Sequence, residues 1–180
     1  MHRTVQFTAV SMTGLLAGNE LGTALWFHPA VKDLPLRAQI EAEQTISGRL
    51  GRVMPFSMTG ALTSAIAAAV DRRGERGSGP TAAAAGATAL MLGITLVGNL
   101  PLNARTAAYP RSGDLAGWQD IRRRWERLHG ARVLLDVAAF AALTAAALRD
   151  GQPRDPAPSR GVSRRRRPAE GGRWHPGHPG

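Results

Sequence analysis

The sequence predicts an all-α integral membrane protein, a four-helix bundle whose long fourth helix extends out of the membrane, with a disordered C-terminal tail. Long apolar runs rich in Ala, Leu, Gly and Thr continue to about residue 149, after which Pro, Gly and Arg dominate. The mean hydropathy of −0.17 averages these two unlike parts and is therefore misleading. We expect a four-span domain over residues 1–150 and a disordered tail over 151–180.

Composition excludes several classes of function. The 180 residues include no cysteine, which rules out disulfides, thiolate nucleophiles and iron–sulfur clusters. A formal charge of +10 is typical of proteins that bind nucleic acid, but there is only one tyrosine, and exposed aromatics are not interleaved with the basic residues. Long apolar runs flanked by arginines fit membrane lipids as partners, and no nucleic acid is expected.

The first span is expected over residues 4–31, long enough for a hydrocarbon core of about 30 Å. A secretory signal is the competing interpretation, which Asn19 and Glu20 oppose because they fall where such a signal stays apolar. A carboxylate inside a span is costly unless paired, so Glu20 is a candidate site residue. His28, which precedes a proline at an expected helix end or kink, should point the same way as Glu20. In the alternative interpretation, Glu20 only bonds a neighbouring helix, and His28 only caps the helix at the membrane boundary.

An amphipathic helix over residues 32–52 should lie at the membrane or lead into it, with its charges mainly solvated. The second span follows over 53–70, with Pro55 expected to kink its start. Arg52 stands just before this span, where it can either extend to lipid headgroups or face inward.

A short charged turn over residues 71–79 should join antiparallel helices, followed by an alanine-rich third span over 81–100. Asn99 and Asn103 lie one turn apart around a proline. Their amides can bond carbonyls freed by that proline or bind a ligand. Residues 105–113 are expected to form a loop.

The last helix is expected over residues 115–148, capped by Ser112 or Asp114, with its apolar half, 133–148, as the fourth span. Six side chains in this helix recur at spacings of 4, 3, 4, 3 and 4, which keeps them within roughly 40° of one line. They are Trp118, Arg122, Trp125, His129, Arg132 and Asp136.

Four spans place both termini on one side of the membrane. The Lys and Arg residues divide almost equally between the two sides of the membrane. On the side of the termini, however, the arginine run at 164–167 is expected to lie outside any helix. Both termini are therefore expected in the cytoplasm. The six-residue stripe should then face Glu20, His28, Arg49, Arg52, Asn99 and Asn103 at the outer end of the bundle.

The segments GNELG, FHP, EQTISGRLGRVMP, NLPLN and WERLHGARVLLDVAAF resemble the anthrone oxygenase family of small four-span membrane proteins. The resemblance covers about residues 10–148. It implies oxidation of an anthrone to an anthraquinone by O₂ without a bound organic cofactor. An anthrone has an acidic methylene, and its anion reacts with O₂ directly, which requires a base and a cation beside the developing oxyanion.

Roles can be assigned on that basis. His129 is the expected base, with Glu20 or Asp136 behind it, and Arg122 and Arg132 are the expected cations. The proposed substrate contacts are Trp118, Trp125, His28, Asn99, Asn103, Arg52 and Asp136. The substrate would be a hydrophobic aromatic small molecule, with the two indoles stacking on it.

Three alternatives stay open. In the first, the chain is a non-catalytic membrane module that binds a lipid or a partner helix. Trp118 and Trp125 are then interfacial anchors, and Arg132 and Asp136 form an i,i+4 pair. In the second, His28 and His129 bind a metal or haem, although no tight ligand spacing exists. In the third, the chain is a transporter, which four short spans without an evident repeat disfavour.

Overall fold

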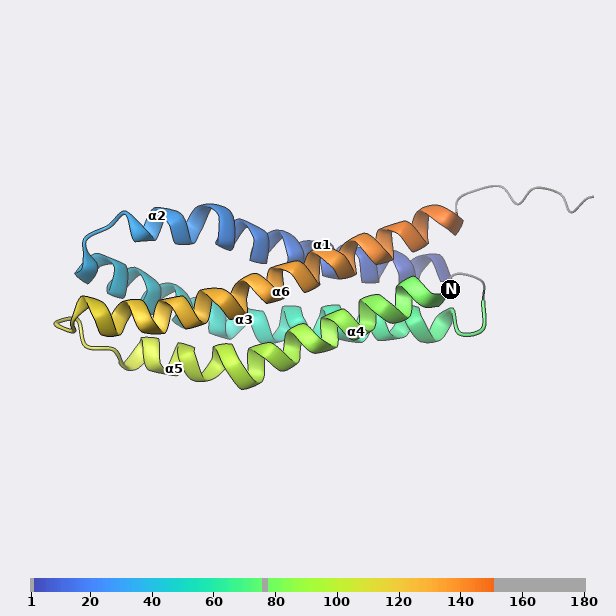
Figure 1. Ribbon diagram of the computed structural model, residues 1–180. Coiled ribbons are helices and arrows are strands. Elements are labelled where there is room, and N and C mark those ends of the chain that lie inside the picture. Colours follow the sequence, from blue (N-terminus) through green and yellow to red (C-terminus); the bar gives the residue numbers. More distant parts are fainter. Residues whose placement is uncertain (1, 76–77, 151–180) are drawn as a thin grey trace, which may run out of the picture.

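The computed structural model describes residues 2–75 and 78–150, and within these ranges the chain is helical and contains no strand. Four long rods follow one another (Figure 1). The first joins α1 (His2–Gly22), the π-helical turn η1 (Thr23–Phe27) and α2 (His28–Lys32); the second is α3 (Leu36–Asp71); the third joins α4 (Ser78–Ile94), the π turn η2 (Thr95–Asn99) and α5 (Leu100–Ala108); the fourth is α6 (Leu115–Asp150). The predicted all-α class is confirmed, and the predicted tail lies outside the described residues.

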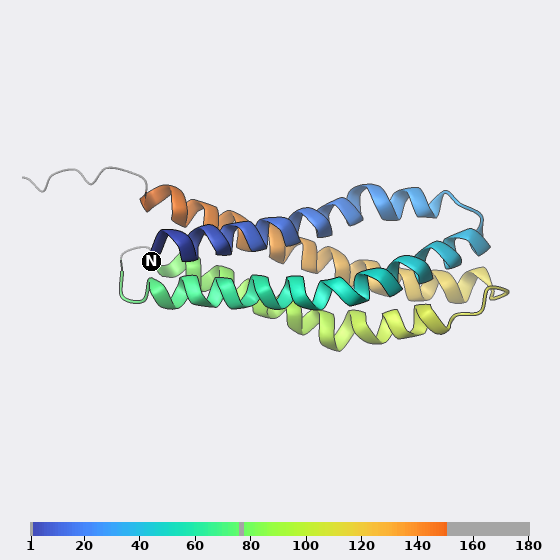
Figure 2. The same cartoon turned by 180° about the vertical axis from the view of Figure 1, so that it is seen from behind.

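The rods run antiparallel in up-and-down order, as the two opposite views show (Figures 1 and 2). α1 packs against α3 and α6, and α4 packs against the same two helices, so the four rods form a closed ring of neighbours. The beginning of α1 and the end of α6 lie at one end of the bundle. The connections α2–α3 and α5–α6 lie at the other end, here called the polar end.

Small side chains hold the rods together at the end near the termini. The buried core there comprises Ala9, Ala65, Ala68, Ala84, Ala139 and Leu143. Farther toward the polar end, Met58 and Met91 pack with Leu16 and Ala61. Such small residues let helix backbones approach closely, which is how helices associate where lipid removes the hydrophobic driving force.

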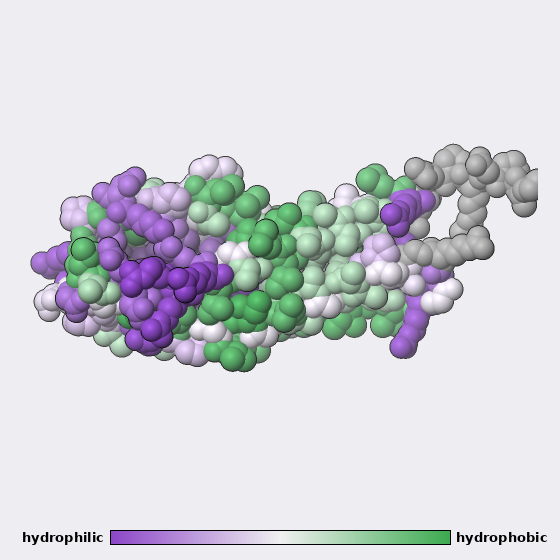
Figure 3. Space-filling view, in the orientation of Figure 1, coloured by the Kyte–Doolittle hydropathy of each residue, from purple (hydrophilic) through white to green (hydrophobic). Residues whose placement is uncertain are grey.

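Three rods are long and apolar enough to cross a membrane: α3, the stretch Ser78–Ala108, and α6 up to Arg149. Their surface is apolar over the middle of the molecule, while hydrophilic residues gather at the polar end (Figure 3). Phe56 and Val97, for example, are 80% and 83% exposed. The chain is therefore a membrane protein. The first rod, predicted as a span, is not among these three, and so the four-span arrangement stays a prediction.

Both π turns directly precede an Xaa-Pro pair, His28-Pro29 in the first rod and Leu100-Pro101 in the third. Proline has no N–H for the i→i−4 bond, and its ring crowds the carbonyl of that residue. The wider turn resolves this conflict: the His28 N–H bonds the Thr23 carbonyl and the Leu100 N–H bonds the Thr95 carbonyl, both five residues back. The rods therefore continue through their prolines.

Two predicted boundaries were wrong. The helix predicted to begin at residue 32 begins at Leu36 and leads directly into the second span, so that α3 is one continuous helix that includes Pro55. The expected loop 105–113 begins later, because α5 continues to Ala108. At the start of α6, Asp114 is the cap, since its Oδ1 accepts the Gly117 N–H at 2.7 Å.

Candidate functional site

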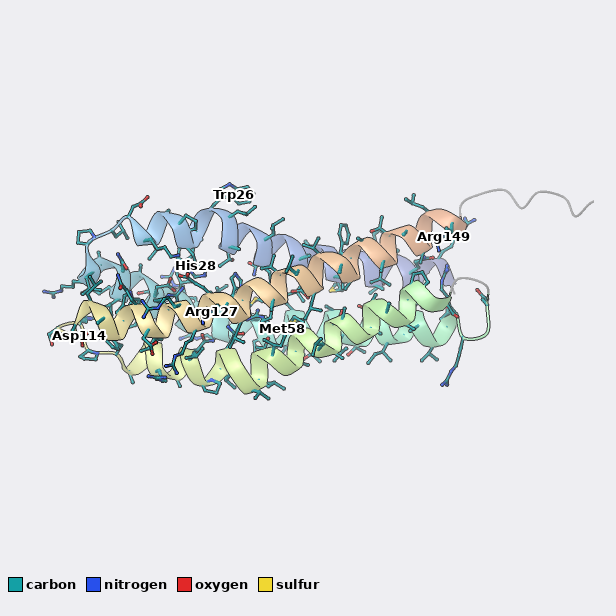
Figure 4. All side chains as sticks on the ribbon, in the orientation of Figure 1. Trp26, His28, Met58, Asp114, Arg127 and Arg149 are labelled. Atoms are coloured by element: carbon teal, nitrogen blue, oxygen red, sulfur yellow. The ribbon has the colours of Figure 1, made fainter. Side chains whose placement is uncertain are left out.

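The six-residue stripe of α6 faces the inside of the bundle near the polar end. Five of its side chains are at most 8% exposed, and Trp125 is half-buried. The interpretation of both tryptophans as interfacial anchors does not hold for Trp118, which is only 2% exposed. Trp26 of η1 points outward, whereas His28 points between the helices (Figure 4).

Glu20 of α1 is the centre of the deeper polar cluster. It is 3% exposed, and its Oε1 accepts a hydrogen bond from Arg132 Nη2. Its Oε2 lies 3.1 Å from His129 Nδ1, a distance that suits an ion pair, although neither atom makes a hydrogen bond. The charged carboxylate is tolerated at this depth because a guanidinium and an imidazole share it.

Asp136 lies one turn beyond Arg132 and is completely buried. Neither of its oxygens has a hydrogen-bond partner, and Arg132 pairs with Glu20 instead. The expected Arg132–Asp136 pair is therefore not the one formed. Because a fully buried carboxyl group without a hydrogen-bond partner favours its neutral form, Glu20 is the carboxylate that balances the charge of Arg132.

A second cluster lies nearer the polar end and centres on Glu43 of α3. Its Oε1 is 2.9 Å from Arg122 Nη2 and 2.9 Å from His28 Nδ1. Arg122 Nη2 is also 3.1 Å from His28 Nδ1, so that nitrogen either donates to Glu43 or accepts from Arg122. With neutral His28, this cluster is balanced in charge.

Arg122 precedes the apolar stretch of α6 that starts at Val133. Burial lowers the pKa of its guanidinium, and the carboxylates of Glu43 and Glu126 act in the opposite direction. An arginine titrates so far above neutrality that the group remains cationic.

Trp125 connects the two clusters. Its ring stacks on His129 at 4.5 Å between centroids, with an angle of 29° between the planes, and lies 4.7 Å from His28 edge to face. The Arg122 guanidinium carbon is 4.6 Å from the ring centroid, a cation–π contact.

The two predicted amides hold Trp125 from the third rod. The indole N–H donates to Asn103 Oδ1 at 2.7 Å, and Asn99 Nδ2 donates to the Trp125 carbonyl at 3.5 Å. The sequence left open whether these amides bond freed carbonyls or a ligand; they bond the tryptophan that lies inside the cluster.

Two cavities meet at this site. An inner cavity of about 140 Å³ lies among the four rods and is lined by Glu20, Trp125, His129 and Arg132, among others. An outer cavity of about 410 Å³ opens at the polar end, where charged side chains such as Lys32, Arg123 and Glu126 line it. His28 and Glu43 line both cavities and form the wall between them.

The π turn in the first rod explains how Glu20 and His28 reach the same interior. Eight residues of regular α-helix would leave them about 80° apart at about 100° per residue. The extra residue of the π turn η1 removes about 100° of rotation, which brings both side chains close to one line. Both are buried, at 3% and 6% exposure.

The structure brings together every predicted site residue except Arg49 and Arg52, which are exposed on α3 and line neither cavity. Asp136 is adjacent to the cluster but also lines neither cavity. Glu43 was missed, because its charge was attributed to a solvated face. A signal was present: Glu43 lies at helical spacing from Ile40 and Ser47, on the inward side of α3.

The arrangement offers a base, two guanidinium groups and a stacked indole beside a largely apolar cavity. His129 Nε2 and His28 Nε2 are both buried, and neither has a hydrogen-bond partner. Within residues 2–75 and 78–150, no group of three His, Asp or Glu side chains is placed to hold a metal ion.

The family model described as anthrone oxygenase matches residues 46–142. This range contains the whole stripe, Asn99 and Asn103, but not Glu20, His28 or Glu43. No curated protein and no solved structure matches the chain.

Proposed function

The chain belongs to the anthrone oxygenase family, and on that premise we propose that it is a membrane oxygenase that oxidises a hydrophobic polycyclic aromatic of the anthrone type with O₂. The observation that carries the proposal is His129 Nε2, a buried nitrogen without a hydrogen-bond partner on a side chain that lines the inner cavity. Buried polar atoms are nearly always satisfied, and the exceptions cluster where a ligand completes the set.

In this proposal His129 removes a proton from the methylene of the anthrone. The Glu20 carboxylate, 3.1 Å from Nδ1, favours the tautomer that carries its proton on Nδ1, which leaves Nε2 as the basic nitrogen. The Glu20 carboxylate beside Nδ1 favours uptake of the methylene proton, because it stabilises the positively charged imidazolium. A positioned general base of this kind contributes about 10²–10⁴-fold to the rate.

The resulting anion is electron-rich and reacts with O₂ at the former methylene carbon. Proton return gives a hydroperoxide, and loss of the second C–H proton with cleavage of the O–O bond gives a quinone and one water. Overall, anthrone and O₂ become anthraquinone and H₂O, and O₂ is the only oxidant required. Arg132, which also lines the cavity, is placed to stabilise the oxyanion.

We include the first rod in the membrane part of this proposal, which gives four spans with both termini on one side, expected to be the cytoplasm. From His2 to Lys32 the rod measures about 45 Å at about 1.5 Å per residue, longer than a hydrocarbon core. Its outer surface exposes Phe7, Leu15, Leu25 and Trp26. Its buried acid, Glu20, is paired inside the bundle.

The competing proposal is a non-catalytic module in which the polar stripe only joins helices. Joining helices requires satisfied hydrogen bonds, since an unpaired buried polar group costs about 1–3 kcal/mol. Here His129 Nε2, Arg132 Nε and both oxygens of Asp136 lack partners. That pattern favours a ligand site over simple helix association.

The test is turnover by the purified protein in lipid nanodiscs, with an anthrone as substrate and O₂ uptake and quinone absorbance as readouts. Wild type should exceed His129→Gln by at least about 100-fold. Arg127→Gln is the matched control for Arg132→Gln, because Arg127 is exposed on the same helix. Melting temperatures identify variants that merely unfold. A wild-type rate equal to that of folded His129→Gln would refute the proposal.

A further inference from the structure

We propose that the inner cavity opens sideways into the lipid between α3 and the η2–α5 segment, and that a membrane-dissolved aromatic enters through this lateral opening. The identity of the substrate rests on the proposed function; the opening itself rests on the geometry below.

One line of α3 faces α5. The Gln44 side-chain amide donates to the carbonyls of Tyr109 at 2.9 Å and Thr106 at 3.2 Å, which fixes the direction of this line. Gly51 and Pro55 follow Gln44 by seven and eleven residues and therefore lie within about 20° of it. Both thus face the third rod.

Gly51, Pro55 and Leu100 line the inner cavity and are also exposed on the surface of the molecule. Residues that do both mark the place where a cavity reaches the surface. Gly51 leaves the space open: a Cβ added there would meet no other atom within 4 Å.

The backbone of the third rod contributes to this opening. α4 and α5, on either side of η2, pack against both α3 and α6, whereas η2 packs against α6. The wider π turn thus lies toward α6 at the level of the cavity. On the facing rod, Pro55 has no N–H to bond the Gly51 carbonyl, which leaves an acceptor at the entrance for a phenolic hydroxyl.

The surface around the opening is apolar. Leu96 and Val97 on η2 are 56% and 83% exposed, and Leu100, which lines the cavity, is 55% exposed. Arg52, exposed next to Gly51 on α3, suits the headgroup level. The lateral opening therefore meets lipid close to the membrane interface, where amphiphilic aromatics concentrate, whereas the charged outer cavity meets water.

The size of the inner cavity supports the same conclusion. Its volume of about 140 Å³ is smaller than the roughly 300 Å³ at which pockets for drug-sized ligands begin. A three-ring aromatic would fill the cavity and continue into the lateral opening. Gly51 would then contact the substrate as well as admit it.

The experiment blocks the opening and follows a ligand that cannot react. Anthracene is partitioned into nanodiscs, and its association is followed by energy transfer from tryptophan, with Trp125→Phe protein giving the background. Gly51→Phe should slow association at least tenfold. Gly48→Phe is the matched control, because Gly48 is also exposed on α3 with no atom within 4 Å but lines neither cavity.

A second variant removes any dependence on folding. The chain has no cysteine, so Gly51→Cys and Gly48→Cys each introduce a unique thiol that a bulky maleimide can modify after purification. Modification at 51 should block association, and modification at 48 should not. Two results would overturn the lateral opening. One is an association rate equal to that of wild type when position 51 is blocked, and the other is no association of anthracene with the wild-type protein. Association without turnover of an anthrone would overturn only the proposed function.

Discussion

Glu20 Oε2 lies 3.1 Å from His129 Nδ1, although the two residues belong to the first and last rods of the bundle. Arg132, one turn from His129, shares the same carboxylate. Glu20 thus connects the α6 stripe to α1 and supplies the negative charge beside the expected base. The predictions below test this arrangement and the packing that holds it.

Glu20→Gln should destabilise the protein by about 3–5 kcal/mol, because Arg132 would be left buried without its counter-ion. Arg132→Gln should cost a similar amount for the converse reason. The double variant should be clearly more stable than the sum of the two single effects predicts. Reversible unfolding in detergent measures all four proteins of the cycle. Additive single effects would contradict the pairing.

Glu43→Gln should be more destabilising than Glu41→Gln. Glu43 is 3% exposed and forms an ion pair with Arg122, so its loss leaves a buried guanidinium without its counter-ion and should cost about 3–5 kcal/mol. The Glu41 side chain is 41% exposed and pairs only with exposed arginines, so its loss should cost at most about 1 kcal/mol. Equal melting temperatures for the two variants would show that the Glu43 cluster contributes little to stability.

Trp125→Leu should raise the KM for a polycyclic substrate by about three- to tenfold, because an aromatic contact contributes about 0.5–1.5 kcal/mol beyond its buried area. Trp26→Leu is the control, since Trp26 is 70% exposed on the outer surface. Initial rates across substrate concentrations in nanodiscs provide the measurement. A rise in KM for Trp26→Leu alone would place binding outside the inner cavity.

Gly14→Ala should be less stable than Gly18→Ala, although the two glycines lie one turn apart on α1. An added Cβ at 14 would lie 2.9 Å from Phe140 Cε2, whereas at 18 it would meet no atom within 4 Å. Overpacking costs about 1–3 kcal/mol, while glycine to alanine in an open helical position gains up to about 1 kcal/mol. Thermal unfolding of both variants beside wild type checks the order, and the reverse order would rule out tight α1–α6 packing.

The sequence by itself determined the class of the protein and the inner face of α6. Apolar runs and alanine density require burial in lipid or against other helices, and the spacing of Trp118, Arg122, Trp125, His129, Arg132 and Asp136 places them on one side of a helix regardless of what surrounds it. The buried acid Glu20 was also identifiable, because an ionisable group in an apolar span requires a partner.

Only the tertiary structure decided which partners those residues have. Arg132 pairs with Glu20 and not with Asp136, and Glu43 lies inside the bundle and not in solvent. The helical period specifies which way a side chain points from its own helix. Which residues pair across the bundle depends on how far apart the helices lie and how each is rotated about its axis. In the first rod that rotation is set by the π turn before His28, which regular helical spacing does not include.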